Sequence, residues 1–225
     1  MCTAILLSGG IGSRMKQSVP KQYMLLAGKP VIMHTLERLG HIEGLEKIVV
    51  VCAQEYQAYI RSMLGQYGID KPVVFAQPGK TRQDSVKAGL DCVDTETVLI
   101  HEAVRPFVRA EDFSRILHCE EENVILGVPE HYTVAKGHGT VSEFLDRSEL
   151  VIVQAPQKFS ANVLKTAHEM AEKEGRQFTE DASLVLFYNK DLKIKILEGM
   201  DYNIKLTTPT DILVADSIYR EYFQK

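Results

Sequence analysis

Residues 6–15 read LLSGGIGSRM, and residues 19–22 read VPKQ. The apolar run over residues 3–7 predicts a buried strand, and the three glycines that follow within four positions let backbone N–H groups approach a ligand closely. The first 36 residues contain no Asp or Glu, although the whole chain has a net charge of -4. This local excess of cations favours an anion, such as a polyphosphate, after the first strand. On the glycines alone, an ordinary turn flanked by solvated lysines stays open as an alternative.

The common phosphate-binding motifs do not match these glycines. A dinucleotide fingerprint that begins at Gly10 would need a glycine at Met15. A P-loop that ends in Gly79-Lys80-Thr81 would need a glycine at Val74. A nicotinamide oxidoreductase built on a Rossmann sheet is therefore disfavoured.

Strand and helix patterns alternate along the chain. Apolar residues at helical spacing follow Pro30, while Thr81 with Asp84 and Thr208 with Asp211 have the spacing of helix N-cap pairs. Apolar runs rich in β-branched residues predict strands over residues 3–7, 47–52, 72–76, 97–101, 124–128 and 192–197. The alternation predicts an α/β fold, a Rossmann-like and mostly parallel sheet covered by helices, with the ligand at the carboxyl ends of the strands.

Length and composition limit the class of protein. A chain of 225 residues with 45% hydrophobic and 25% charged residues is most simply one domain over residues 1–225. Its apolar runs are too short for a membrane helix, and its start lacks a signal-peptide pattern, so a cytoplasmic protein is expected. The four cysteines lack a zinc or disulfide spacing, and a pI near 6.0 without a basic block disfavours nucleic acid.

Six ordered motifs over about 200 residues resemble one enzyme family. They are the glycine stretch, 79–86 (GKTRQDSV), 101–106 (HEAVRP), 145–148 (LDRS), 179–183 (TEDAS) and 203–207 (NIKLT). Together they resemble the cytidylyltransferases that activate polyol phosphates, either methylerythritol 4-phosphate in isoprenoid synthesis or ribitol 5-phosphate. The resemblance implies a nucleotide-diphospho-sugar transferase-like fold, CTP and a polyol phosphate as substrates, Mg²⁺ as cofactor and pyrophosphate as product.

The implied chemistry needs cations more than it needs a base. The attacking phosphate oxygen is already an anion, so catalysis consists of positioning and of positive charge around the transferring phosphoryl group. The resemblance assigns these charges to Arg14, Lys21 and Lys205. A non-catalytic nucleotide-binding relative is the less favoured alternative, because a binding module needs no such set of cations.

The resemblance also assigns the nucleotide and metal sites. Mg²⁺ is usually held by substrate phosphates with one or two carboxylates. The family has Asp where this chain has Glu102, so we expect Glu102 to ligate the metal or a water molecule in its shell. The implied nucleotide-binding residues are Ser8, Gly9, Gly10, Gly12, Gly79, Ser85, Glu102 and Ala103.

Residues 130–150 lack a helical period and contain the turn Gly137-His138-Gly139, so they predict a β-hairpin. In the resembling family this segment is an arm that reaches over the partner subunit of a homodimer. The polyol phosphate is then expected near Arg105 and Thr179 of one subunit and near Thr133 and Arg147 of the other. A surface hairpin on a monomer stays open as the alternative.

The acceptor is the most divided prediction. Tyr132 replaces an Asp and Ala155 replaces a Thr of the methylerythritol enzyme, while Gly9-Gly10 and Val104 are more like the ribitol enzyme. The motifs at 81–85, 146–148 and 179–183 closely resemble those of the methylerythritol enzyme, and they include the positions nearest the acceptor phosphate in that family. We therefore predict 2-C-methyl-D-erythritol 4-phosphate, with ribitol 5-phosphate as the alternative.

Overall fold

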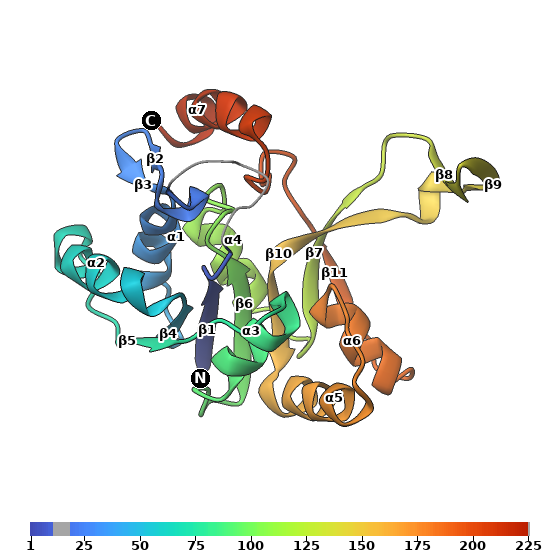
Figure 1. The fold of residues 1–225 in the computed structure, drawn as a ribbon, viewed down its shortest axis with the longest axis horizontal. Helices are drawn as coiled ribbons and strands as arrows, with labels where there is room; N and C mark the ends of the chain where they lie inside the picture. Colours follow the sequence, from blue (N-terminus) through green and yellow to red (C-terminus); the bar gives the residue numbers. More distant parts are fainter. Residues whose placement is uncertain (11–18, 225) are drawn as a thin grey trace.

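The computed structural model describes residues 1–10 and 19–224, and its centre is a seven-stranded sheet (Figure 1). The strand order is β11-β7-β10-β6-β1-β4-β5, and all neighbours pair in parallel except β10, which runs antiparallel to β6 and β7. The strands are β1 (Cys2–Leu7), β4 (Leu45–Val51), β5 (Val73–Ala76), β6 (Thr97–Glu102), β7 (Val124–Pro129), β10 (Val151–Ser160) and β11 (Lys195–Glu198). The predicted α/β fold with a mostly parallel sheet is confirmed.

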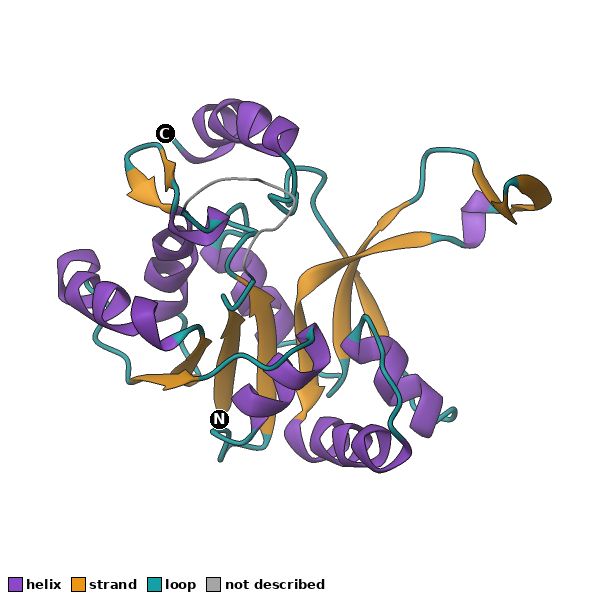
Figure 2. Cartoon of the chain, in the orientation of Figure 1, coloured by secondary structure: helices purple, strands orange, loops and turns teal. Residues whose placement is uncertain are grey.

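Helices cover both faces of the sheet (Figure 2). Alternate residues of β1 and β4 point to opposite faces, so Ala4 and Ile48 join one core while Ile5 and Val49 join the other. The first core is closed by α1 (Val31–Gly40), α2 (Gln54–Leu64) and α4 (Ala110–Leu117), and the second by α3 (Arg82–Leu90), α5 (Ala161–Glu174) and α6 (Asp181–Tyr188). The last helix, α7 (Pro209–Phe223), packs on a smaller cluster that includes Phe107 and Leu206.

Two helix starts follow the predicted capping pattern. The Thr81 hydroxyl accepts the Asp84 N–H, and the Asp84 carboxylate accepts the Thr81 N–H, so both residues satisfy donors at the start of α3. Thr208 and Asp211 form the same reciprocal pair at the start of α7, with Pro209 at the first helical position. These caps confirm the predicted helix starts.

The predicted hairpin over residues 130–150 is confirmed. It is formed by β8 (Val134–His138) and β9 (Thr140–Leu145), joined at Gly139 with a φ of +78°. We call residues 130–150 the arm; it projects from the body of the chain in Figure 1, and Val141 and Phe144 on it are exposed. A two-stranded hairpin without a core of its own is marginal in water, so the arm depends on what it packs against.

Short elements complete the chain: β2 (Leu25–Leu26) and β3 (Lys29–Pro30) pair with each other, and η1 (Lys21–Tyr23), η2 (Gly65–Tyr67) and η3 (Arg147–Glu149) are 3₁₀ turns. Among residues 1–10 and 19–224, no helix is both long and apolar enough to cross a membrane.

Two buried histidines predict a pH-dependent stability. His34 Nε2 lies 2.9 Å from the Leu26 carbonyl and His101 Nε2 lies 3.0 Å from the Arg105 carbonyl, and burial lowers the pKa of each imidazole to about 4. The unfolded chain therefore binds more protons than the folded one between pH 6.5 and pH 4. The free energy of unfolding should therefore decrease as the pH is lowered through this range, by about 1.4 kcal/mol per pH unit for each histidine.

Urea unfolding at pH 6.0, 5.5 and 5.0 measures this slope. His34→Gln should remove the contribution of one histidine, whereas His138→Gln, on the exposed arm, should leave the slope unchanged. Equal slopes in His34→Gln and the unchanged protein would contradict a neutral, buried His34.

Candidate active site

The glycine loop lies at the carboxyl end of β1, beside the end of β6. Leu7 is the register partner of Glu102, so Ser8 and Ala103 leave the sheet side by side. The Ala103 N–H donates to the Leu7 carbonyl at 3.0 Å. The predicted edge for ligand binding is therefore where β1 and β6 end.

Gln22 holds the described part of this loop. Its Nε2 donates to the carbonyl oxygens of Ser8 at 2.7 Å and Gly10 at 2.9 Å. A Cβ atom at Gly9 would overlap the Pro78 side chain, so the loop lies directly against the residue that precedes Gly79. The two predicted glycine segments thus meet, while Gly12 and Arg14 lie outside the described residues.

The second glycine segment is ordered by its own hydrogen bonds. The Gly79 N–H donates to Ser85 Oγ at 3.1 Å, and the Ser85 hydroxyl donates to the Thr81 carbonyl at 2.9 Å. A Cβ at Gly79 would overlap Asp84 in the first turn of α3. Glycine at position 79 is thus required by a close approach of the backbone to the helix.

Glu102 forms ion pairs with three cationic side chains at this edge of the sheet. Its Oε1 lies 2.6 Å from Lys205 Nζ and 3.7 Å from Arg82 Nε, and its Oε2 lies 3.1 Å from Arg105 Nε. Burial alone would raise the pKa of Glu102, but the charges of Lys205, Arg105 and Arg82 outweigh it and lower the pKa to about 2. Glu102 is therefore a carboxylate at any pH near neutrality.

Lys205 is placed here by the polar residues before it. Arg105 Nη1 donates to the Asn203 carbonyl at 2.8 Å, and the buried Asn203 amide donates to the Ala155 carbonyl at 2.8 Å. The Leu206 N–H donates to the Val104 carbonyl at 2.8 Å. The predicted motif around Lys205 is thus fixed along the segment that follows β6, and the Lys205 side chain keeps 38% of its surface exposed.

Lys21 is buried on η1, next to Gln22. Burial raises the pKa of Asp211 at the start of α7, whereas the N–H groups of Thr208 and Thr207 and the charge of Lys21 lower it, with a net lowering. Lys21 is therefore close enough to α7 for its charge to act on that carboxylate.

The predicted acceptor residues fall into two groups. Arg105 and the exposed Thr179 belong to the body of the chain, and Thr179 precedes Glu180, the N-cap residue of α6. Thr133 and Arg147 lie on the arm, where Arg147 Nη1 donates to the His131 carbonyl at 2.8 Å. The arm that carries the second group projects away from the body of the chain in Figure 1.

Glu102, the last residue of β6, is the carboxylate that the sequence analysis assigns to the metal. Among the described residues, no group of three or more His, Cys, Asp or Glu side chains could hold a metal ion. One carboxylate, such as Glu102, is enough for the way in which Mg²⁺ binds with nucleotides, because several waters and the phosphates supply the other ligands. Its remaining lone pairs are limited, because three cations already surround it.

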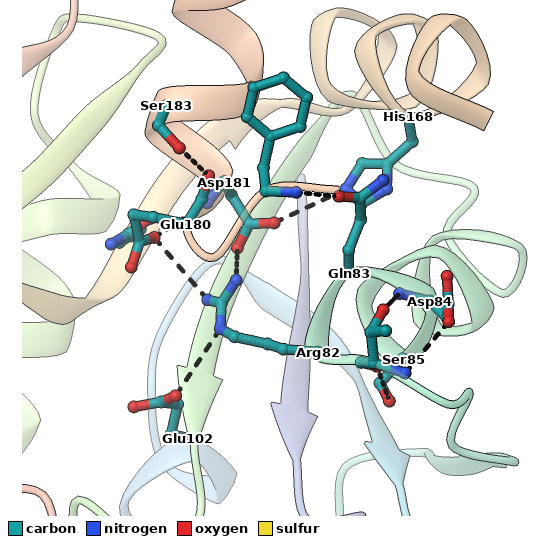
Figure 3. Close-up of polar contacts among 12 residues, drawn as sticks. Arg82, Gln83, Asp84, Ser85, Glu102, His168, Glu180, Asp181 and Ser183 are labelled. Atoms are coloured by element: carbon teal, nitrogen blue, oxygen red, sulfur yellow. Dashed lines mark hydrogen bonds and ion pairs between the residues drawn. The ribbon is translucent and has the colours of Figure 1, made fainter. Parts of the chain in front are cut away.

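Sequence reasoning missed Arg82 and Asp181. Arg82 Nη1 lies 2.7 Å from Asp181 Oδ2, and Figure 3 shows the Arg82 guanidinium between Asp181 and Glu102. Both residues stand inside motifs that the sequence singles out, 79–86 and 179–183. The available signal was the occurrence of opposite charges, Arg82 and Asp181, in two such motifs.

Known proteins resemble this chain in sequence and in overall fold. Residues 2–221 match the family model for IspD, 2-C-methyl-D-erythritol 4-phosphate cytidylyltransferase. The chain is 38% identical to the enzyme of that name from Bacillus cytotoxicus (96% of this chain, 97% of the relative) and 36% identical to the chloroplastic enzyme from Oryza sativa (97% and 74%).

Its fold is similar to the crystal structure of 4-diphosphocytidyl-2C-methyl-D-erythritol synthase from Anaerococcus prevotii, with a TM-score of 0.86 and 27% identity over 100% of this chain and 96% of that chain. The resemblance drawn from the six motifs is thereby confirmed. The chain belongs to the 2-C-methyl-D-erythritol 4-phosphate cytidylyltransferase family.

Proposed function

We propose that this protein transfers CMP from CTP to 2-C-methyl-D-erythritol 4-phosphate and releases pyrophosphate, a step of isoprenoid synthesis. The observation that carries the proposal is the cluster of Lys205, Arg105 and Glu102 at the end of β6, directly beside the glycine loop after β1. A triphosphate and a phosphate must meet in this reaction, and both are attracted by this edge.

The reaction joins one acceptor oxygen to the α-phosphorus of CTP while the bond to the pyrophosphate oxygen breaks. The acceptor phosphate is ionised at neutral pH, so no residue has to remove a proton. Lys205 and Arg105 together carry one positive charge more than Glu102, and this excess can stabilise the charge that develops around the α-phosphorus. Arg14 and Lys21 are proposed to add to it.

The loops are proposed to hold the nucleotide mainly through backbone groups. Gln22 holds the carbonyl oxygens of Ser8 and Gly10, and the N–H groups of Gly9 and Gly10 are proposed to face the ligand. Gly79 and Ser85 lie next to this loop through Pro78. Small residues at these positions let a base and a ribose approach the backbone.

Glu102 is proposed to bind Mg²⁺ directly or through a water molecule. When bound, the ion would neutralise part of the triphosphate charge. Lys205 and Arg105 keep Glu102 ionised and limit its rotation, so they fix the oxygen that faces the phosphates.

The acceptor is proposed to lie between two subunits of a homodimer. Arg105 and Thr179 would contact it from one chain, and Thr133 and Arg147 would contact it from the arm of the partner. The exposed, coreless arm supports this arrangement, because contact with a second chain would supply the packing that it lacks.

The acceptor is tested by measuring kcat/KM for methylerythritol 4-phosphate and ribitol 5-phosphate with the same CTP and Mg²⁺. We expect the higher value for methylerythritol 4-phosphate, because discrimination between polyols depends on paired hydroxyl contacts. A higher value for ribitol 5-phosphate, the acceptor that Gly9-Gly10 and Val104 favour, would contradict the assignment.

Tyr132 is the residue to vary in the same assay. Tyr132→Asp restores a carboxylate on the arm that can accept a hydrogen bond from a polyol hydroxyl. It should raise the ratio of the two kcat/KM values in favour of methylerythritol 4-phosphate. Thr140→Asp, at a polar and exposed arm position, serves as the matched control and should leave the ratio unchanged.

A further inference from the structure

Arg82 joins three elements of the fold at the proposed site. It is the first residue of α3, and Figure 3 shows its guanidinium between Glu102 of β6 and the start of α6. Its Nη1 lies 2.7 Å from Asp181 Oδ2, its Nη2 lies 3.8 Å from Glu180 Oε1, and its Nε lies 3.7 Å from Glu102 Oε1. One planar side chain thus spans two carboxylates at the start of α6 and the carboxylate that holds Lys205.

The next residue of α3 ties down the same segment. Gln83 Oε1 accepts the Phe178 N–H at 2.7 Å, and Gln83 Nε2 donates to the Arg176 carbonyl at 3.1 Å. Thr179 therefore lies between Phe178, held by Gln83, and Asp181, held by Arg82. The position of this proposed acceptor residue depends on the first turn of α3.

Asp181 makes the link strong. Only 2% of its side chain is exposed, and His168 Nε2 lies 3.6 Å from its Oδ1. Burial would raise the pKa of Asp181, but the Arg82 charge and His168 outweigh it, so the pKa is lowered and the carboxylate stays ionised. Removing either partner of this pair would leave an uncompensated charge at a buried position, so the contact between Arg82 and Asp181 is costly to break.

We propose that Arg82 is a positioning residue for cytidylyl transfer: it holds the Thr179 segment and Glu102 at a fixed separation, and so aligns the acceptor with the nucleotide. Its three carboxylate partners occupy the guanidinium, so it acts through them and not by binding substrate. The inference rests on the proposed function. In-line attack is sensitive to such alignment, since a displacement of about 1 Å can cost about 100-fold in rate.

The nucleotide loop should not depend on Arg82. Gly79 and Ser85 are held by hydrogen bonds within the loop, and the start of α3 by the reciprocal pair of Thr81 and Asp84. Loss of the Arg82 side chain leaves all of these contacts in place, and Glu102 keeps its shorter ion pairs with Lys205 and Arg105. CTP binding and acceptor alignment can therefore be separated by experiment.

The test compares Arg82→Met, Asp181→Asn and the double variant with the unchanged enzyme. Each single variant leaves a buried charge without its partner and should lower the melting temperature, whereas the double variant removes both charges and should recover most of it. We expect kcat/KM for the polyol phosphate in the double variant to stay about 30-fold or more below normal, because the link is still missing. The Kd for CTP, measured by calorimetry without acceptor, should change by less than about threefold.

Two further variants complete the design. Lys87→Met, on the same helix with a solvent-exposed ion pair to Glu172, is the matched control and should behave normally. Arg82→Lys keeps the charge but cannot span three carboxylates, so it should fold and still lose most of the acceptor kcat/KM. It decides the question if the double variant does not fold.

Recovery of both melting temperature and acceptor kcat/KM in the double variant would overturn the proposal, since Arg82 would then be only structural. A fully active Arg82→Lys, or a parallel loss of CTP affinity, would overturn it as well. Failure of the proposed function looks different: the unchanged enzyme itself would show no turnover with CTP and a polyol phosphate.

Discussion

Lys205→Ala and Lys21→Ala are each expected to lower kcat by about 100-fold or more, with the fold intact. Lys205 Nζ lies 2.6 Å from Glu102 Oε1 at the edge where the phosphates are proposed to bind, and its side chain is partly exposed, so the ammonium group can face a ligand. A cation that serves the transition state affects kcat, because the charge around the α-phosphorus develops only there. Stopped assays of pyrophosphate release at saturating substrates measure this loss.

Lys47→Ala is the control for removing a lysine from an ion pair. Lys47 Nζ lies 2.7 Å from Asp94 Oδ1 on the surface, away from the proposed chemistry, so kcat should stay normal. Circular dichroism melts of all three variants check the fold. Near-normal kcat in Lys205→Ala or Lys21→Ala, in a folded protein, would rule out the proposed role for that lysine.

Mixing Arg147→Ala chains with Lys21→Ala chains is expected to restore activity that neither variant has alone. Arg147 lies on the exposed arm and Lys21 on the body, so a site shared between subunits takes one residue from each chain. A heterodimer then has one intact site and one site with both changes. Random exchange makes half of the dimers mixed, so about a quarter of the normal activity should return.

The matched control mixes Lys21→Ala with Lys205→Ala. Both changes lie on the body, so no heterodimer has an intact site, and no activity should return. If heterodimers of Arg147→Ala and Lys21→Ala form and remain inactive, Arg147 either acts in the site of its own subunit or takes no part in the chemistry.

The fold was largely predictable, because local signals and tertiary structure agree in most elements. The alternation of strand and helix patterns predicts the sheet, and the capping pairs at Thr81 and Thr208 predict two helix starts. The antiparallel β10 was missed: its sequence contains Gln154, Gln157 and Lys158, polar side chains that are buried in the structure. Their burial comes from neighbours far apart in sequence, as when Lys158 Nζ donates to the Cys119 carbonyl at 2.5 Å.

The site was predictable in its motifs but not in its contacts. The glycines and Lys205 could be recognised from the local composition and from the residues beside them. The network of Arg82, Glu102 and Asp181 instead joins positions about 20 to 100 residues apart in sequence, and only the parallel sheet brings them together. The roles of Mg²⁺ and of a second subunit remain predictions, and so do those of Gly12 and Arg14, which lie outside the described residues.

The central claim is that an acceptor phosphate oxygen attacks the α-phosphorus of CTP. It is tested most directly with methylerythritol 4-phosphate whose phosphate oxygens carry ¹⁸O, by following the label with ³¹P NMR and mass spectrometry. The proposed reaction predicts that all of the label stays in the cytidine diphosphate product, with one labelled oxygen as the bridge, and that pyrophosphate carries none. Label in pyrophosphate, or CMP as the nucleotide product, would contradict it.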